Sequence, residues 1–259
     1  MIIAGGKLHP AAWRAETVDR AWSLVPTHYA PSTRSHIAAA MRRCIERLIE
    51  AGAPASLRNV VPRVHKGEPR QRVATEAERR AILNGAPLDL RLFILLCSDL
   101  ALRSGTACSV APAHRDSQRN EIRLQRMKHG ASIVLPLTDN IVACMDAVPP
   151  DTPERSTKPY VLLLSTRNQD VQRLAYNYRS RFLRLCKRLN ITDLRPHDLR
   201  RTTAEKVYGI TSDLRVVQGL LGHRNMSSTT WYLQRQQMKP SQQLVEAAAE
   251  YADTTEGGE

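Results

Sequence analysis

Four residues in the C-terminal third of the chain have the types and spacing needed for chemistry on a phosphodiester. His197 and Arg200 lie three positions apart, His223 follows, and Tyr232 comes nine residues after that histidine. A guanidinium hydrogen-bonds two phosphoryl oxygens at once and stays charged at any working pH, so it stabilises charge that develops at phosphorus. A tyrosine hydroxyl, with an ordinary pKa of ~10, becomes a nucleophile when cations stabilise its phenolate and an imidazole accepts its proton. The set predicts covalent catalysis on a phosphate ester.

The order of these residues resembles that of the tyrosine recombinase (phage integrase, Xer and Cre) family. The family pattern is H-x-x-R, then L-G-H, then a nucleophilic Tyr about nine residues later, and residues 195–234 contain all three parts. Two earlier family elements are also recognisable, an Arg at the end of a buried helix (Arg103 in ALRSG) and a Lys in a hairpin turn (Lys128 in RMKHGASIVLPL). The resemblance covers residues 73 to 238, and a weaker likeness to the helical core-binding domain covers 10 to 66.

The resemblance implies a role for each residue. Arg103 and Arg200 would bind the phosphoryl oxygens, His197 would be the general base, and His223 a further phosphate donor. Tyr232 would attack phosphorus to give a 3′-phosphotyrosyl linkage, and Lys128 would protonate the departing 5′-oxygen. No metal, ATP or other cofactor is implied. One departure concerns Thr106, which stands where the family often has an acidic residue three positions after its first Arg.

Each residue also has a purely structural interpretation. Arg103 could be a cation at a helix C-terminus, where it would stabilise the helix dipole. Gly222 could be only a helix C-cap, and His197 only a helix-entry residue that bonds the backbone. Lys128 could be a solvated hairpin residue, with His129 as a competing candidate, and Tyr232 a core or interface aromatic.

Charge gives an independent indication. The 38 Lys and Arg against 25 Asp and Glu give a net charge of +13, and the pI is near 10.0. Residues 1–72 carry 12 basic and 5 acidic side chains, and the remainder carries 26 and 20. Both halves are therefore basic, as expected of a protein that binds a polyanion along its whole length.

The cysteines and the hydropathy pattern place limits on the protein class. The five cysteines have neither disulfide-framework nor zinc-ligand spacing, so we expect buried small hydrophobes in a reducing compartment. The start of the chain lacks a secretory signal pattern. The best apolar stretch of the chain, residues 92–96, is too short to span a membrane. We expect a cytoplasmic, nucleoid-associated protein without membrane contact.

The sequence indicates a mainly α fold with a small antiparallel β-sheet in two domains. Residues 1–66 would form the helical core-binding (DNA-clamp) domain, 67–74 a basic linker, and 75–259 the catalytic domain with a C-terminal tail helix. Helices are expected at Thr17 to Val25, Ser35 to Ala51, Thr75 to about Leu83, Asp89 to Arg103, Gln172 to Leu189 and Ser241 to Tyr251, with further helices starting at Leu199, Asp213 and Thr229. A hairpin is expected from Glu121 to Met127 and Ile133 to Leu137.

The resulting prediction is a site-specific recombinase that acts on double-stranded DNA recombination sites, in the integration or excision of a mobile element. The family implies a homo-tetramer on two DNA sites, with or without accessory proteins. The basic residues chosen as DNA contacts are Arg42, Arg43, Arg47, Arg179, Lys187 and Arg201. Two alternatives remain open on the residues alone, a catalytically inactive DNA-binding protein of the same fold and a metal-independent nuclease that uses the histidines and Lys128.

Overall fold

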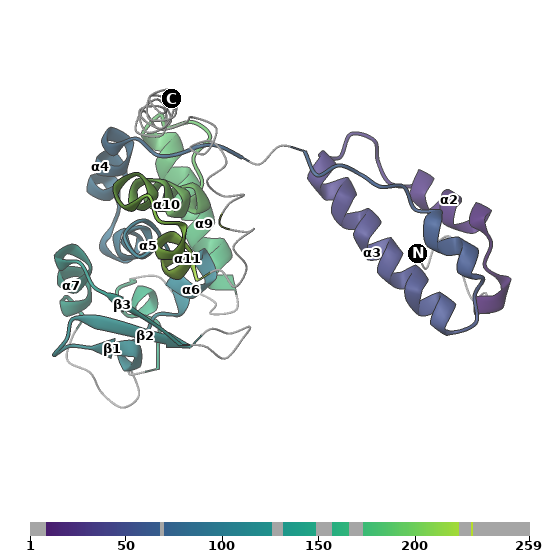
Figure 1. The fold of residues 1–259 in the computed structure, drawn as a ribbon. Helices are drawn as coiled ribbons and strands as arrows, with labels where there is room; N and C mark the ends of the chain where they lie inside the picture. Colours follow the sequence, from purple (N-terminus) through teal and green to yellow (C-terminus); the bar gives the residue numbers. More distant parts are fainter. Residues whose placement is uncertain are drawn as a thin grey trace, which may run out of the picture. The chain divides into compact units, whose positions relative to one another are not determined.

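The chain divides into two compact units, which are described separately. The computed structural model describes residues 9–67, 70–125, 132–148, 157–165, 173–222 and 229. The first unit comprises Met1–Arg70 and the second Gln71–Glu259 (Figure 1). No helix in these ranges is long and apolar enough to cross a membrane.

The first unit is a helical hairpin around a small core. Helix α2 (Ala15–Ser23) and the long helix α3 (Pro31–Glu50) both contact the short 3-10 turn η2 (Ala55–Asn59), and a second 3-10 turn, η1 (Pro10–Ala12), precedes α2. The core contains Trp13, Val18, Ala38, Met41, Ile45, Ala53, Leu57 and Val61. Helix α3 begins four residues before the expected start, because Pro31 is its first helical residue rather than a flanking one.

The second unit is mainly helical and is built around helix α5 (Leu88–Ser98), which is buried almost all round. Helices α7 (Asp139–Asp146), α8 (Tyr160–Leu163), α9 (Leu174–Arg188) and α10 (Pro196–Thr211) all contact α5. Helix α4 (Glu76–Gly85) contacts α9, and α11 (Leu214–Leu221) contacts α10. The helix expected from Thr75 is confirmed. It opens with a capping box between Thr75 and Glu78, residue types whose spacing is typical of this motif.

The small antiparallel sheet lies at one end of the second unit, beside α7 (Figure 1). Strands β1 (Arg115–Asp116), β2 (Glu121–Gln125) and β3 (Ser132–Pro136) pair in that order, with Ile122 opposite Leu135 and Leu124 opposite Ile133. Ile122, Leu124 and Leu135 are buried, so one face of the sheet packs on the core. The expected hairpin is confirmed, whereas β1 is too short to produce a periodic signal, and the turn 126–131 lies outside the described residues.

Two helix boundaries differ from the sequence prediction in ways that matter for the site. Helix α5 ends at Ser98 rather than Arg103, because Asp99 caps it and Ala101 takes a left-handed conformation with φ +49. The apolar run Leu100–Leu102 is buried without being helical. Helix α10 begins at Pro196, three residues before the expected Leu199, so its first turn contains His197.

Three short helices were not predicted. Helix α6 (Ser104–Ser109) follows the Ala101 turn, and α7 and α8 lie on either side of residues 149–156. Helix α11 begins after Asp213 as expected, because the Asp213 carboxylate accepts from the Arg215 amide at 2.7 Å. Thr229, where a further helix was expected, is helical and fully buried, and the expected tail helix at 241–251 lies outside the described residues.

A buried polar cluster holds α5 and α9 together. Asp89 accepts hydrogen bonds from Tyr178 Oη at 2.6 Å and from Arg181 at 2.5 and 2.9 Å, and the Arg181 guanidinium lies 4.7 Å from the centre of the Tyr178 ring. Burial raises the pKa of Asp89, but the hydrogen bonds from Arg181 and Tyr178 outweigh that effect, and the net pKa is lowered. The buried negative charge of Asp89 is therefore balanced by the positive charge of Arg181 within the core.

Candidate active site

Arg200 joins three segments of the second unit. Its side chain is buried, with a relative exposure of 2% for the residue. Nη1 donates to the carbonyl of Ala101, and Nη2 donates to the carbonyl of Leu221 at 2.6 Å. One guanidinium on α10 thus holds the turn that leads to Arg103 and the end of α11 that leads to His223.

Arg103 occupies the start of a helix. It is the N-cap residue of α6, where its carbonyl accepts from the Ala107 amide at 2.8 Å. Its side chain is exposed, and it has no hydrogen-bond or ion-pair partner among the described residues. The interpretation of Arg103 as a cation that stabilises a helix C-terminus is therefore wrong, because at an N-terminus the dipole opposes a positive charge. This placement gives a positive potential that favours an anion.

His197 lies in the first turn of α10 with its residue exposed to solvent. Protein atoms still surround the imidazole enough that desolvation lowers its pKa, and the charges of Arg200, Arg103 and Arg201 lower it further, against the opposing effect of Asp198. The capping bond at this helix end comes from Asp198, whose carboxylate accepts from the Arg195 amide at 2.8 Å. The lowered pKa favours the neutral form of His197, in which a ring nitrogen can accept a proton.

The structure brings Arg103, His197 and Arg200 into one positively charged region. Both arginines act on the imidazole of His197, and Arg200 is bonded to the Ala101 turn two residues before Arg103. Gly222 caps α11 in the left-handed conformation, with φ 60, so it is a C-cap and also the residue that precedes His223. Lys128, His223 and Tyr232 themselves lie outside the described residues.

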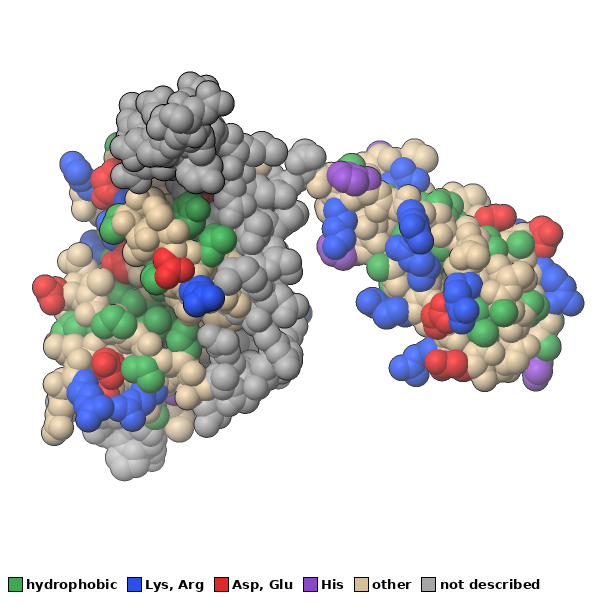
Figure 2. All heavy atoms as spheres, in the orientation of Figure 1, with side chains coloured by type: hydrophobic (Ala, Val, Ile, Leu, Met, Phe, Trp, Pro, Cys, Tyr) green, Lys and Arg blue, Asp and Glu red, His purple; other side chains and the backbone are tan. Residues whose placement is uncertain are grey.

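The predicted DNA contacts differ in accessibility. Arg43, Arg47, Arg179 and Lys187 are exposed, and Arg42 is half-buried with Nη1 near the Pro62 carbonyl at 3.5 Å. Lys and Arg side chains are spread over the first unit (Figure 2). Arg201 is different, because it is buried and donates to Glu205 at 3.0 Å, with side-chain exposures of 7% and 15%. Because its guanidinium is paired with the Glu205 carboxylate inside the protein, Arg201 is not retained among the expected phosphate contacts.

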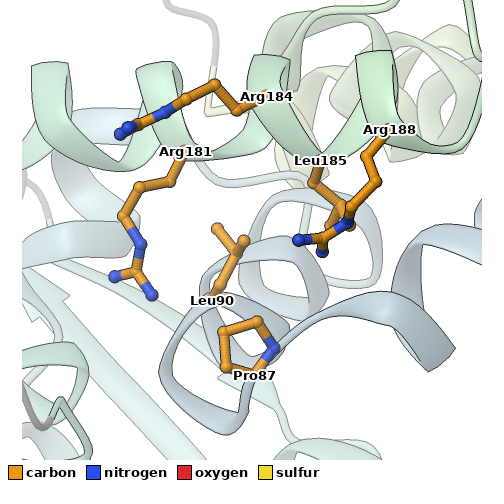
Figure 3. Close-up of a pocket in the computed structure, with 6 residues that line it drawn as sticks. All are labelled: Pro87, Leu90, Arg181, Arg184, Leu185 and Arg188. Atoms are coloured by element: carbon orange, nitrogen blue, oxygen red, sulfur yellow. The ribbon is translucent and has the colours of Figure 1, made fainter.

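Helix α9 has basic residues beside a small pocket. The pocket is lined by Pro87, Leu90, Leu185 and the three arginines Arg181, Arg184 and Arg188 (Figure 3). Arg181 is committed to Asp89, and Arg188 donates to the Gly85 carbonyl at 3.3 Å. Arg181 and Arg188 therefore help to hold α9 against α5 and α4.

The cysteines depart from expectation at one position. Cys97, Cys108, Cys144 and Cys186 are buried, as expected, but Cys44 is exposed on α3. Within the part of the chain that the structure describes, no group of three or more His, Cys, Asp or Glu side chains could hold a metal ion.

Comparison with known families decides the classification. A family model for the phage integrase family matches residues 71–239, about two-thirds of the chain. The chain belongs to the phage integrase family. It is therefore a tyrosine recombinase by family, and the matched range spans Arg103, His197, Arg200 and the three catalytic candidates outside the described residues.

Individual relatives agree with this assignment. The tyrosine recombinase XerD of Vibrio cholerae is 25% identical over 224 residues, which cover 81% of this integrase-family chain and 72% of the relative. XerD of Vibrio vulnificus is 25% identical over 222 residues, with the same coverage.

Solved structures show the same fold at low sequence identity. A lambda integrase dimer bound to a COC′ core site has a TM-score of 0.66 and 16% identity, and the match covers 87% of this chain and 81% of that one. The Tn1549 transposon integrase with transposon right end DNA has a TM-score of 0.63 and 14% identity over 96% and 88%. A lambda integrase tetramer bound to a Holliday junction has a TM-score of 0.59 and 18% identity over 83% and 65%. The predicted fold class is confirmed.

Sequence reasoning missed the residues that hold this site together. The Ala101 and Leu221 carbonyls, which accept from Arg200, are backbone groups that no motif identifies. Asp198 could have been found, since Pro at the first helical position followed by Asp in the first turn is a helix-start signal. Thr202 and Thr203, whose hydroxyls bond to Ala74 and Ser98, carry no sequence signal for these long-range contacts.

Proposed function

We propose that this protein is a site-specific recombinase that cuts and rejoins double-stranded DNA through a 3′-phosphotyrosyl intermediate on Tyr232. Its membership of the phage integrase family supports the reaction class. The observation that carries the proposal is the pair of Arg200 bonds, to Ala101 and Leu221, which tie the Arg103 turn and the residue before Gly222-His223 to the helix that bears His197.

The proposed first step is an in-line displacement at phosphorus. The Tyr232 oxygen bonds to the phosphorus while the bond from phosphorus to the 5′-oxygen breaks. His197, neutral because its pKa is lowered, accepts the tyrosine proton, and Lys128 donates a proton to the departing 5′-oxygen. The linkage remains a phosphodiester, so a second 5′-hydroxyl can attack it in the reverse sense without an added energy source.

Arg103 and Arg200 would stabilise the transition state from different positions. Arg103, exposed at the N-terminus of α6, would donate to the phosphoryl oxygens directly. Arg200 is buried, so its charge acts in a medium of low dielectric where its effect on an oxyanion is larger than in water. His223, next to the cap of α11, would add a further hydrogen bond to the phosphate.

The proposed partner is a double-stranded recombination site bound by four copies of the chain. Arg42, Arg43, Arg47, Arg179 and Lys187 would contact backbone phosphates, which explains why both units are basic. The lambda integrase tetramer on a Holliday junction, whose fold this chain shares, supports four protomers per exchange. We place the reaction in the cytoplasm at the nucleoid, where accessory proteins could join it.

We propose that the exchange integrates or excises a mobile element. The fold neighbours include lambda integrase and the Tn1549 transposon integrase, and the latter supports this role. The test is to sequence the junctions formed in cells that express the protein. Junctions between element ends and a chromosomal site would support mobility, and junctions confined to a duplicated chromosomal site would assign dimer resolution instead.

The decisive experiment is covalent trapping with a suicide substrate that is nicked near the cleavage point. The parent should form a complex that resists denaturant, and Tyr232→Phe should bind the same DNA with the same affinity and form none, because only the nucleophilic oxygen is lost. The phosphotyrosyl bond should map to Tyr232 by mass spectrometry. An adduct with the Phe variant would remove Tyr232 from the mechanism, and a parent that cuts DNA without any adduct would identify a nuclease.

A further inference from the structure

The segment by which the chain enters the second unit is fastened to the catalytic helix. The backbone amide of Ala74 donates to the hydroxyl of Thr202 on α10 at 2.8 Å, across 128 residues of sequence. Both residues are buried, with exposures of 6% and 8%. Because a buried amide that loses its acceptor is costly, this contact fixes the position of residue 74 on α10.

The same hydroxyl is bonded on its other side to the first turns of α10. Thr202 Oγ1 donates to the carbonyl of Asp198 at 2.8 Å, so one oxygen connects the incoming segment to the residue between His197 and Arg200. The donor and an acceptor lone pair of the hydroxyl are both in use, which fixes its rotamer. A displacement of residue 74 therefore acts on the part of α10 that presents the catalytic candidates.

Neighbouring contacts also fasten the incoming segment to α4 and α10. Arg72 donates to the Glu78 carboxylate, and the Thr75 amide donates to Glu78 Oε2 at 2.8 Å. Lys206, one turn further along α10, pairs with Glu76 at 2.9 Å. Thr203, the residue of α10 that follows Thr202, bonds to the Ser98 carbonyl at the end of α5. Residues 72–76 are consequently bonded to α10, and they follow closely after the first unit in sequence.

We propose that Thr202 is a positioning residue that couples the DNA-bound state of the first unit to the placement of His197 and Arg200. A displacement of residues 70–74 would act on α10 through the bonds of the Thr202 hydroxyl to the Ala74 amide and the Asp198 carbonyl. The proposal rests on the proposed function, because it concerns the rate of the cleavage step. It predicts that loss of this hydroxyl slows cleavage at saturating DNA while leaving DNA affinity unchanged.

Thr202→Val is the test, since valine keeps the shape and the β-branch of threonine and removes only the hydroxyl. Thr211→Val on the same helix is the matched control. Thr211 Oγ1 also donates to the carbonyl four residues earlier, that of Val207, at 2.8 Å, and also accepts a backbone amide, that of Asp213, at 3.3 Å. The two hydroxyls differ in that Thr202 is buried and bonds the amide of Ala74, in the segment that follows the first unit, whereas Thr211 is exposed and bonds an amide close to it in sequence. Thr202→Ser, which restores the hydroxyl, is the rescue variant.

The measurements are the equilibrium affinity for an uncleaved site and the single-turnover rate of adduct formation at saturating suicide substrate. All variants of the full chain are assayed below the lowest of their unfolding temperatures. We expect Thr202→Val to form adduct about tenfold more slowly than the parent, roughly the effect of one lost buried hydrogen bond, with unchanged affinity. Thr211→Val and Thr202→Ser should match the parent. If the valine variant does not fold, Thr202→Ala carries the same expectation.

Three results would overturn the coupling. They are a rate for Thr202→Val equal to that of the parent, equal slowing in Thr202→Val and Thr211→Val, and a loss of affinity without a loss of rate. A parent that forms no adduct contradicts the proposed function itself, whereas an active parent with an equally active Thr202→Val variant contradicts only the role of Thr202. The two failures are therefore distinct.

Discussion

Arg103 and Arg200 are assigned to the same phosphate, but their substitution should have opposite consequences for stability. Arg200→Ala removes the donor from two carbonyls, those of Ala101 and Leu221, inside a site where Arg200 is 2% exposed. A buried polar group that loses its partner costs ~1–3 kcal/mol, so the second unit should lose roughly 3 kcal/mol or more. Arg103→Ala removes an exposed cation from a helix N-terminus and should leave stability unchanged or slightly increased.

Hydrogen exchange measured by mass spectrometry can resolve this difference within one molecule. Peptides from α10 and α11 report the opening of the second unit, and a loss of roughly 3 kcal/mol should speed their exchange on the order of a hundredfold. Peptides from α3 report the first unit and should exchange at the parent rate in both variants. Adduct formation should fall in both, by at least the ~3 kcal/mol effect of a lost oxyanion donor.

The reasoning about Arg200 would be refuted by parent-like exchange in α10 and α11 of the Arg200→Ala variant. That result would mean that its two carbonyl bonds do not hold the segments together. If Arg103→Ala instead accelerated exchange across the second unit, Arg103 would have a structural partner, and its assignment to the phosphate would lose its support.

Three further predictions concern titration, the core and DNA binding. Because the pKa of His197 is lowered, the rate of adduct formation should persist below pH ~6.5, the ordinary imidazole value, and should fall only at more acidic pH. A His197→Gln variant should form adduct much more slowly than the parent, and its rate should not show this fall in acid. Asp89→Asn should cost ~3–5 kcal/mol in urea unfolding at neutral pH, because it leaves the Arg181 charge buried without its carboxylate. Since the pKa of Asp89 is lowered, that contribution is present above pH ~3.9 and is lost as the pH falls through the folded value, so the variant and the parent should converge in acid. Arg43→Ala with Arg47→Ala should reduce the slope of log affinity against log salt by roughly 2, whereas Arg20→Ala on α2 should leave the slope unchanged.

The catalytic candidates could be predicted from sequence because their spacing follows from local geometry. His197 and Arg200 lie on one helix, so an interval of three residues places them on the same side. The helix starts at Thr75 and Asp213 could also be predicted from the sequence, since each cap is a contact between residues only two or three positions apart. Local patterns therefore predicted most helices of the described chain and part of the site.

The contacts that hold the site together could not be predicted, because they join residues that are far apart in sequence. The run Leu100–Leu102 continues the apolar pattern of α5, and nothing in it shows that Ala101 will adopt a positive φ. The bond from Arg200 to Ala101 spans 99 residues. Arg201 has the same residue type as the exposed arginines, and only the tertiary structure shows that it is buried against Glu205. A basic side chain on a helix can be predicted to contact DNA only when its exposure to solvent is known.

The exposure of Cys44 has a practical consequence for experiments on this protein. Burial raises the pKa of Cys108 to about 12 and that of Cys186 to about 11, and it also raises those of Cys97 and Cys144, so these four thiols are shielded and poorly ionised. Cys44 is the exposed one and directly follows Arg43 on α3. The unaltered chain therefore already carries one selective attachment point for a fluorophore or spin label, next to the surface that we expect to meet DNA, and its rate of alkylation would report that contact without any engineered cysteine.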